Sequence, residues 1–161
     1  MKMKSYHPLI IAIGLYLAIV AQVSIAPAVA PFGCVPDFLL LALGLFSMRG
    51  GRLSGAMIGF FAGILYGGVA GANIQLYVFS RVIAGLLIGS VSSMELDSSF
   101  LLASIVSVFT VLIGQGIMIL LAPHPNLIGL VGATIETAVY NGVLAIPVYA
   151  LLKRIQGPAM H

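Results

Sequence analysis

Apolar residues fill long stretches of this chain, and short polar or proline- and glycine-rich segments separate them at intervals of about twenty residues. Stretches of this length and polarity are typical of helices that cross a membrane. The first, after a basic N-terminus, is too long for the apolar part of a signal peptide and predicts a retained span. The expected spans cover about residues 8–29, 33–48, 53–70, 74–92, 100–121 and 127–152.

A glycine at every fourth position marks the third expected span and its ends: Gly51, Gly55, Gly59, Gly63, Gly67 and Gly71. Glycine weakens a water-soluble helix, but in lipid a bare ridge allows close approach of a neighbouring helix. Because four residues advance about 400°, the ridge drifts by about 40° at each step. We therefore predict that this helix is central and contacts at least two neighbours. Gly85 and Gly89 repeat the four-residue spacing in the next span. As an alternative to packing wholly within this chain, one end of the ridge is left open for a helix of another protein.

Composition places the chain among membrane proteins. Of 161 residues, 61% are hydrophobic and 7% charged, whereas about a quarter of residues are charged in soluble domains. We predict one all-α integral membrane domain of six transmembrane helices, with no soluble catalytic domain. The single Cys34 cannot form an internal disulfide, and three scattered histidines predict no metal site. Because no nucleophile elbow or catalytic triad is recognisable, the sequence predicts neither an enzyme nor a cofactor.

Basic residues fall on one side of the six-span arrangement. These residues are Lys2, Lys4, Arg49, Arg52, Lys153 and Arg154. The excess of lysine and arginine on cytoplasmic segments predicts that both termini are cytoplasmic. A five-span arrangement would remove this asymmetry. The net charge of +3 therefore indicates orientation and not nucleic-acid binding.

Four polar residues lie within or at the rims of the expected spans: Asp37, Arg81, Glu136 and Asn141. Ionisable groups in a membrane usually face the bundle interior and pair. Arg81 and Glu136 lie at similar expected depths, so we predict an Arg81–Glu136 pair, with Asp37 as an alternative or third partner. Asn141 is expected to make interhelical hydrogen bonds. A structural role for these groups competes with a proton relay or a polar substrate pocket.

Several local features coincide with those of one family. They are Pro36-Asp37 before a leucine-rich span, the basic turn at 49–52, the glycine-rich third span, and Tyr140-Asn141 before Pro147 and Lys153-Arg154. Over about residues 8–154 the chain resembles the rod shape-determining protein MreD family. Where many relatives have an aspartate after the third span, this chain has Tyr66-Gly67.

The resemblance implies a six-helix protein of the bacterial inner membrane that belongs to the cell-elongation machinery. Its implied partner is the bitopic protein MreC, and the wider assembly includes MreB, RodZ, RodA and the penicillin-binding transpeptidase of RodA. The implied fold is similar to that of the S components of vitamin importers. Two functions follow: a non-catalytic scaffold that binds MreC and helps to organise peptidoglycan synthesis, or a small-solute-binding S component, which needs a pocket with several convergent polar groups.

Overall fold

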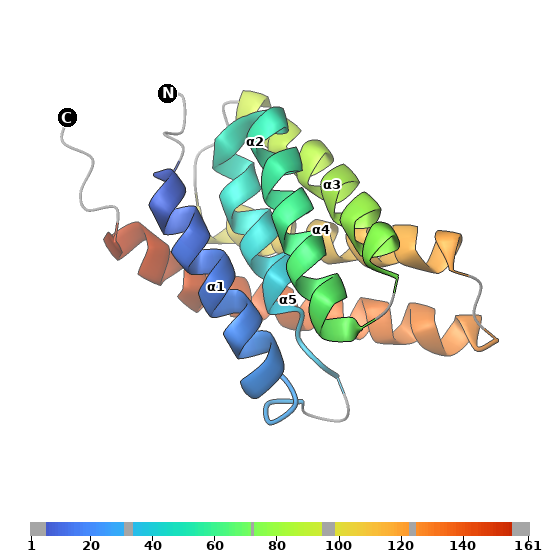
Figure 1. Cartoon of the computed structure of the whole chain (residues 1–161). Helices are drawn as coiled ribbons and strands as arrows, with labels where there is room; N and C mark the ends of the chain where they lie inside the picture. The colour runs from blue at the N-terminus through green and yellow to red at the C-terminus, as the bar shows by residue number, and fades with distance from the viewer. Residues whose placement is uncertain (1–5, 31–33, 72, 95–98, 123–124, 156–161) are drawn as a thin grey trace.

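Helices account for nearly all of the computed structural model, which describes residues 6–30, 34–71, 73–94, 99–122 and 125–155 (Figure 1). The expected basic residues Lys2 and Lys4 and the acidic residues Glu95 and Asp97 lie outside these ranges. The elements are α1 (Pro8–Ser24), α2 (Phe38–Ala70), α3 (Ile74–Gly89), the 3-10 helix η2 (Ser90–Met94), α4 (Phe100–Leu121) and α5 (Leu127–Ile155). In Figure 1, α4 and α5 run across the group formed by α1, α2 and α3.

Helix α2 reverses direction at Gly51. There φ is 83° and ψ is 174°, a combination that is essentially restricted to glycine. A Cβ atom added at Gly55 would lie 3.2 Å from the Cβ atom of Ser47, so the chain folds back beside itself. We call residues 38–50 the first limb of α2 and residues 52–70 its second limb. These limbs occupy the places expected for spans two and three, with a sharp turn between them.

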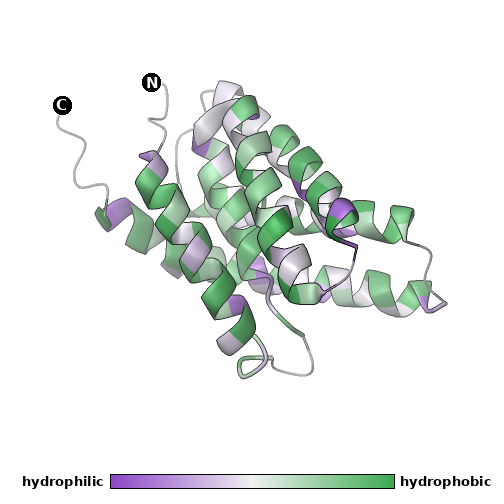
Figure 2. Ribbon diagram, in the orientation of Figure 1, coloured by the Kyte–Doolittle hydropathy of each residue, from purple (hydrophilic) through white to green (hydrophobic). Residues whose placement is uncertain are grey.

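Among the residues that the structure describes, four helical segments are long and apolar enough to cross a membrane: Phe38–Ala70, Ile74–Met94, Phe100–Leu121 and Leu127–Ile155. Helix α1 is also apolar but ends at Ser24, earlier than expected, because the chain turns over residues 25–29 around Pro27. Helix α4 coincides with the stretch expected at 100–121. Six crossings of the membrane remain a prediction. Most of the helical ribbon has the colour of hydrophobic residues (Figure 2). Many large apolar side chains are exposed, as expected for helices in contact with lipid.

The first limb of α2 forms the centre of the bundle. Its side chains are buried on all sides, including Leu39, Leu40, Leu41, Leu43, Leu45, Phe46 and Met48. Phe46 contacts Gly14 of α1, while Leu40 and Gly44 pack against Gly114 and Thr110 of α4. The prediction that the glycine-ridged helix is central is therefore wrong. On that second limb Leu53 is 77% exposed, and Met57 and Phe61 are exposed as well. The leucine side chains of the first limb have neighbours on all sides, whereas the second limb leaves one of its sides exposed.

The glycine ridge packs against α3 at four of its positions, and at the first of them, Gly55, it also meets Ser47 of the first limb. A Cβ atom added at Gly55 would overlap the carbonyl group of Gly85, and one at Gly59 would overlap the carbonyl group of Arg81. Farther along, Gly63 meets the backbone of Val78, and Gly67 meets Ile74, whose Cα atom would lie 2.8 Å from the added carbon. The glycine-ridged limb thus contacts two neighbours, as expected, but three of these four glycines meet α3 only. Rows of residues four apart are inclined to the helix axis, so a neighbour that lies along the row follows its drift.

The two ends of the predicted ridge have other roles. Gly71 has a positive φ of 67°, ends α2 in the left-handed conformation and donates its N–H to the carbonyl of Gly67. No atom lies within 4 Å of a Cβ atom added there, so Gly71 is a helix cap and not a packing residue. Gly51 makes the turn between the limbs, and its carbonyl oxygen lies 2.5 Å from a Cβ atom added at Gly89.

Candidate functional site

Side chains from three helices meet the backbone where α2 begins. The first N–H groups of a helix have no intrahelical acceptor, and inside a membrane protein they need one. Asp37 caps α2, because its Oδ1 atom accepts a hydrogen bond of 2.9 Å from the Leu40 N–H. Gln22 of α1 accepts from the Phe38 N–H at 2.7 Å and donates to the Pro36 carbonyl at 3.2 Å. The start of α2 is thus tied to the end of α1.

Asn141 of α5 binds the same backbone from the other side. Its Oδ1 atom accepts a hydrogen bond of 3.1 Å from the Asp37 N–H, and its Nδ2 atom donates to the Asp37 carbonyl at 2.8 Å. Asn141 is fully buried and Asp37 nearly so. The predicted interhelical hydrogen-bonding residue therefore makes two such bonds to one peptide segment, which fixes α5 against α2.

Arg81 of α3 pairs with the Asp37 carboxylate. The distance from Arg81 Nη2 to Asp37 Oδ2 is 3.2 Å, and the two side chains are 3% and 6% exposed. The Arg81 guanidinium also lies 4.3 Å from the ring centroid of Tyr66 and 5.1 Å from that of Tyr77. Aromatic faces attract a cation, and the attraction is larger where water is excluded. We call the group Gln22, Asp37, Tyr66, Tyr77, Arg81 and Asn141 the polar clasp.

Glu136 takes no part in the polar clasp, so the predicted Arg81–Glu136 pair is wrong and the alternative, Asp37, is the partner of Arg81. The inward face of α5 is occupied by Thr137, Ala138 and Asn141, and Glu136 points outward and is exposed. Thr137 donates a hydrogen bond of 3.1 Å to the carbonyl of Val35, which precedes α2. Depth alone suggested Glu136 as a partner, whereas the rotation of α5 about its axis excludes it.

A second arginine lies between two tyrosines at the other end of the first limb. Arg49 donates from Nη2 to the hydroxyl of Tyr149 at 2.8 Å, and its guanidinium lies 5.1 Å from the ring centroid of Tyr6 and 5.4 Å from that of Tyr149. Burial raises the pKa of the Tyr6 phenol above its ordinary value, with Arg49 acting in the opposite direction. The first limb of α2 thus has, at each of its ends, an arginine that lies against two tyrosines.

Sequence reasoning missed Gln22 and the four tyrosines of these two groups. A single polar residue near the end of an apolar stretch, as Gln22 is, signals a partner in the next segment. Tyrosines near span ends are common for another reason, since they favour the membrane–water interface. Their stacking on arginines depends on helix rotation, which the sequence pattern does not define.

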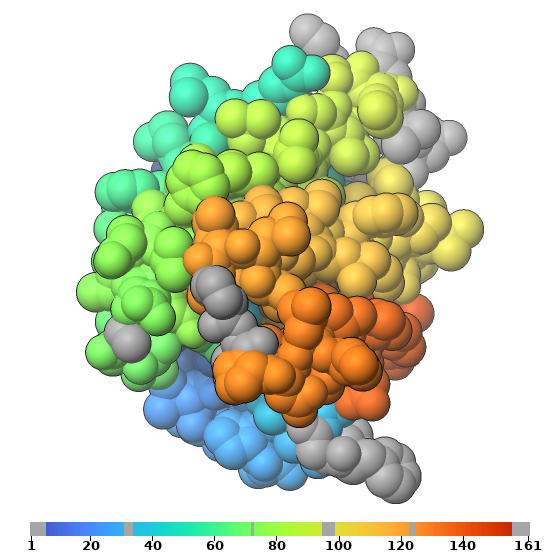
Figure 3. Space-filling model, turned by 90° about the vertical axis from the view of Figure 1, so that its right-hand side faces the viewer, coloured from blue at the N-terminus to red at the C-terminus, as the bar shows by residue number. Residues whose placement is uncertain are grey.

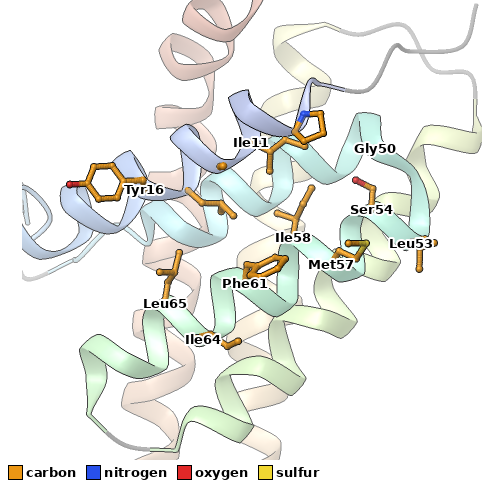
Figure 4. A pocket seen from close by; sticks show the side chains of 13 residues that line it. Ile11, Tyr16, Gly50, Leu53, Ser54, Met57, Ile58, Phe61, Ile64 and Leu65 are labelled. Atoms are coloured by element: carbon orange, nitrogen blue, oxygen red, sulfur yellow. The ribbon is translucent and has the colours of Figure 1, made fainter.

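Helix α1 has an apolar groove on each side. The larger, of about 790 Å³, lies between α1 and the second limb of α2, with Tyr16, Ser54, Met57 and Phe61 among its lining side chains (Figure 4). The smaller, of about 370 Å³, lies between α1, the first limb and the end of α5. Leucine, isoleucine and other apolar residues form nearly all of both linings. These grooves suit hydrocarbon or apolar side chains and lack the convergent polar groups of a solute site.

The arrangement is suited to holding helices together. In the described ranges, no group of three or more histidine, cysteine, aspartate or glutamate side chains is placed to hold a metal ion. The charged and amide groups of the polar clasp bind one another and the backbone. Such a network orients neighbouring helices and gives the bundle one defined packing.

Replacing Asn141 with leucine is expected to destabilise the protein by about 1 to 3 kcal/mol, because the buried Asp37 N–H loses its acceptor, whereas the Asp37 carbonyl keeps the hydrogen bond from the Leu41 N–H. Replacing the exposed Glu136 of the same helix with glutamine is the matched control, with an expected change within about 0.5 kcal/mol. Thermal unfolding in detergent measures both. Equal losses for the two variants would contradict the assignment of Asn141 to the polar clasp.

Comparison with known proteins gives one match. A family model described as rod shape-determining protein MreD matches residues 3–155, which is nearly the whole chain. No curated protein and no solved structure matches it. The apolar helices agree with a membrane protein, and the matched range includes every helix of the structure. The chain therefore belongs to the MreD family of rod shape-determining proteins and has a role in determining rod shape.

Proposed function

We propose that this protein is a non-catalytic scaffold of the bacterial inner membrane, which binds MreC and helps to organise peptidoglycan synthesis during cell elongation. The family's role in rod shape supports the setting. The observation that carries the scaffold role is the polar clasp. Asp37, Arg81 and Asn141 are buried and bound to one another or to the start of α2, so they lock the bundle and leave an apolar outer surface for other membrane helices.

The orientation proposed above has support from the basic residues. The hydrogen bond from Arg49 to Tyr149 brings the turn between the two limbs beside the last turns of α5. Lys153 and Arg154 follow Tyr149 by one turn. The basic residues of both segments therefore lie at one end of the bundle, which favours a cytoplasmic C-terminus. We propose that this end faces MreB and RodZ, and that RodA and its transpeptidase join the assembly through MreC.

The alternative, a solute-binding subunit of an importer, receives no support from the family match. It would also need a polar pocket, and the two grooves beside α1 are apolar.

The test is purification in mild detergent from membranes that contain co-expressed MreC. We expect MreC to co-elute with the protein, and we expect a form of MreC without its transmembrane helix to be lost. An ATPase module that co-elutes together with a bound vitamin would overturn the scaffold proposal. Failure to retain full-length MreC would overturn MreC binding.

A further inference from the structure

We infer that the outward face of α5 around Glu136 docks a partner's transmembrane helix that carries a basic or hydrogen-bond-donating side chain at the depth of Glu136. This inference rests on the proposed scaffold role and adds to it the face and the chemistry of the contact. Within the described residues, that face consists of Ile128, Gly132, Ile135, Glu136, Val139 and Val143.

The position of Glu136 makes it unusual. It precedes Lys153 by seventeen residues in one continuous helix, so it lies about 25 Å along the axis from the basic end, within a hydrocarbon core of about 30 Å. Its outward-facing neighbours Ile135, Val139 and Val143 are apolar and more than half exposed. Ionisable side chains within a membrane usually pair, because lipid solvates a charge poorly.

The bundle itself supplies no partner among the residues that the structure describes. Arg81, the basic side chain expected at this depth, is bound to Asp37 and is buried on the other side of α5. Thr134 and Thr137 carry hydroxyl groups but belong to the buried face of α5. A donor for the Glu136 carboxylate must therefore come from another molecule.

The shape of this face also suits a helix. Gly132 lies one turn before Glu136, and no atom of another described segment lies within 4 Å of a Cβ atom added there. A bare position in the middle of an apolar face allows the backbone of a neighbouring helix to approach closely. In Figure 3 the first half of α5, residues 127–141, in the deeper orange, lies on the surface of the molecule.

A second copy of this chain fits the face poorly. Two copies with the same orientation in the membrane that packed symmetrically through α5 would bring their Glu136 carboxylates to the same depth and close together. Like charges at such a contact repel, and the face holds no donor of its own. The occupant is therefore a different protein, and its helix supplies the positive or donating group.

A photo-crosslinking amino acid placed at Val139 tests this face in the otherwise unchanged protein, co-expressed with MreC. The control position is Phe109 of α4, which is similarly exposed, at 53% against 58% for Val139. We expect a crosslink to the transmembrane helix of MreC from position 139 and none from position 109. Crosslinks from 109 alone, crosslinks between two copies of this chain, or capture of lipid only would overturn the inference.

A charge reversal tests the chemistry. Glu136→Lys is expected to lower the amount of co-purified MreC by about tenfold or more, because a cation then meets the partner's donor. Phe109→Lys, the matched control, should leave the amount unchanged. If wild-type protein retains MreC and Glu136→Lys retains it equally, the inference fails while the scaffold proposal stands. If wild-type protein retains no MreC, both fail.

Discussion

Replacing Asp37 with asparagine is expected to destabilise the protein by about 3 to 5 kcal/mol, because the Arg81 guanidinium then remains buried without its counter-charge. The asparagine side chain keeps an oxygen that caps the Leu40 N–H, so the change removes the charge and preserves the start of α2. Arg81→Gln is expected to cost a similar amount, since it leaves the Asp37 carboxylate in the interior without its counter-charge. Chemical unfolding in detergent measures both losses.

The double variant Asp37→Asn with Arg81→Gln separates the ion pair from other effects. Because no uncompensated charge remains, the double variant should be more stable than the sum of the single losses predicts, by about 1 to 3 kcal/mol. Strictly additive losses would show that the 3.2 Å contact between Arg81 and Asp37 contributes nothing. Each single loss overstates what the pair contributes, because it includes the cost of leaving one charge buried alone, so the coupling is the measure of the pair itself.

Replacing Gly59 with alanine is expected to separate the second limb of α2 from α3 and to abolish rod shape in cells that depend on this protein. The added methyl group would overlap the carbonyl group of Arg81. Because this carbonyl belongs to the backbone of a helix, the overlap is relieved only if one helix moves away from the other. Overpacking of this kind costs about 1 to 3 kcal/mol or more. It would also shift Arg81, the residue that binds Asp37.

Gly68→Ala is the matched control, because it lies in the same limb with no atom within 4 Å of the added carbon. Alanine there should be neutral or stabilising by up to about 1 kcal/mol, since alanine favours a helix over glycine. Unfolding in detergent and restoration of rod shape in a strain without the chromosomal copy measure both variants. Equal behaviour of the two alanine variants would contradict close packing of the ridge on α3.

The sequence pattern located most helices but not how each one is rotated. Apolar length alone placed a helix at residues 100–121, and the Pro36-Asp37 pair marked the start of α2, where Asp37 is the cap. The glycine spacing identified a close helix contact. It did not show that one neighbour, α3, would meet four of the glycines, because a neighbour that lies along the row of glycines follows its drift around the helix.

The centre of the bundle and the partner of Arg81 were beyond the sequence pattern for a related reason. In lipid, an outward leucine and an inward leucine have the same composition, so the burial of the first limb is not visible in its hydrophobicity. Arg81 had two acidic candidates at suitable depth. The choice between Asp37 and Glu136 depends on which side of α5 faces inward, and that is set by Thr137 and Asn141.

The bonds between Asp37 and Asn141 join residues that are 104 positions apart. During synthesis, α2 enters the lipid well before α5 leaves the ribosome. Until then Gln22 of α1 can already bind the Phe38 N–H, but the Asp37 N–H lacks its acceptor, so the newly inserted helices carry a polar group without a partner. In the interval, the insertion machinery or water must provide this group with a hydrogen-bond partner. A chain that ends before α5 would keep the Asp37 N–H without its acceptor, which is the kind of defect that membrane quality-control proteases recognise.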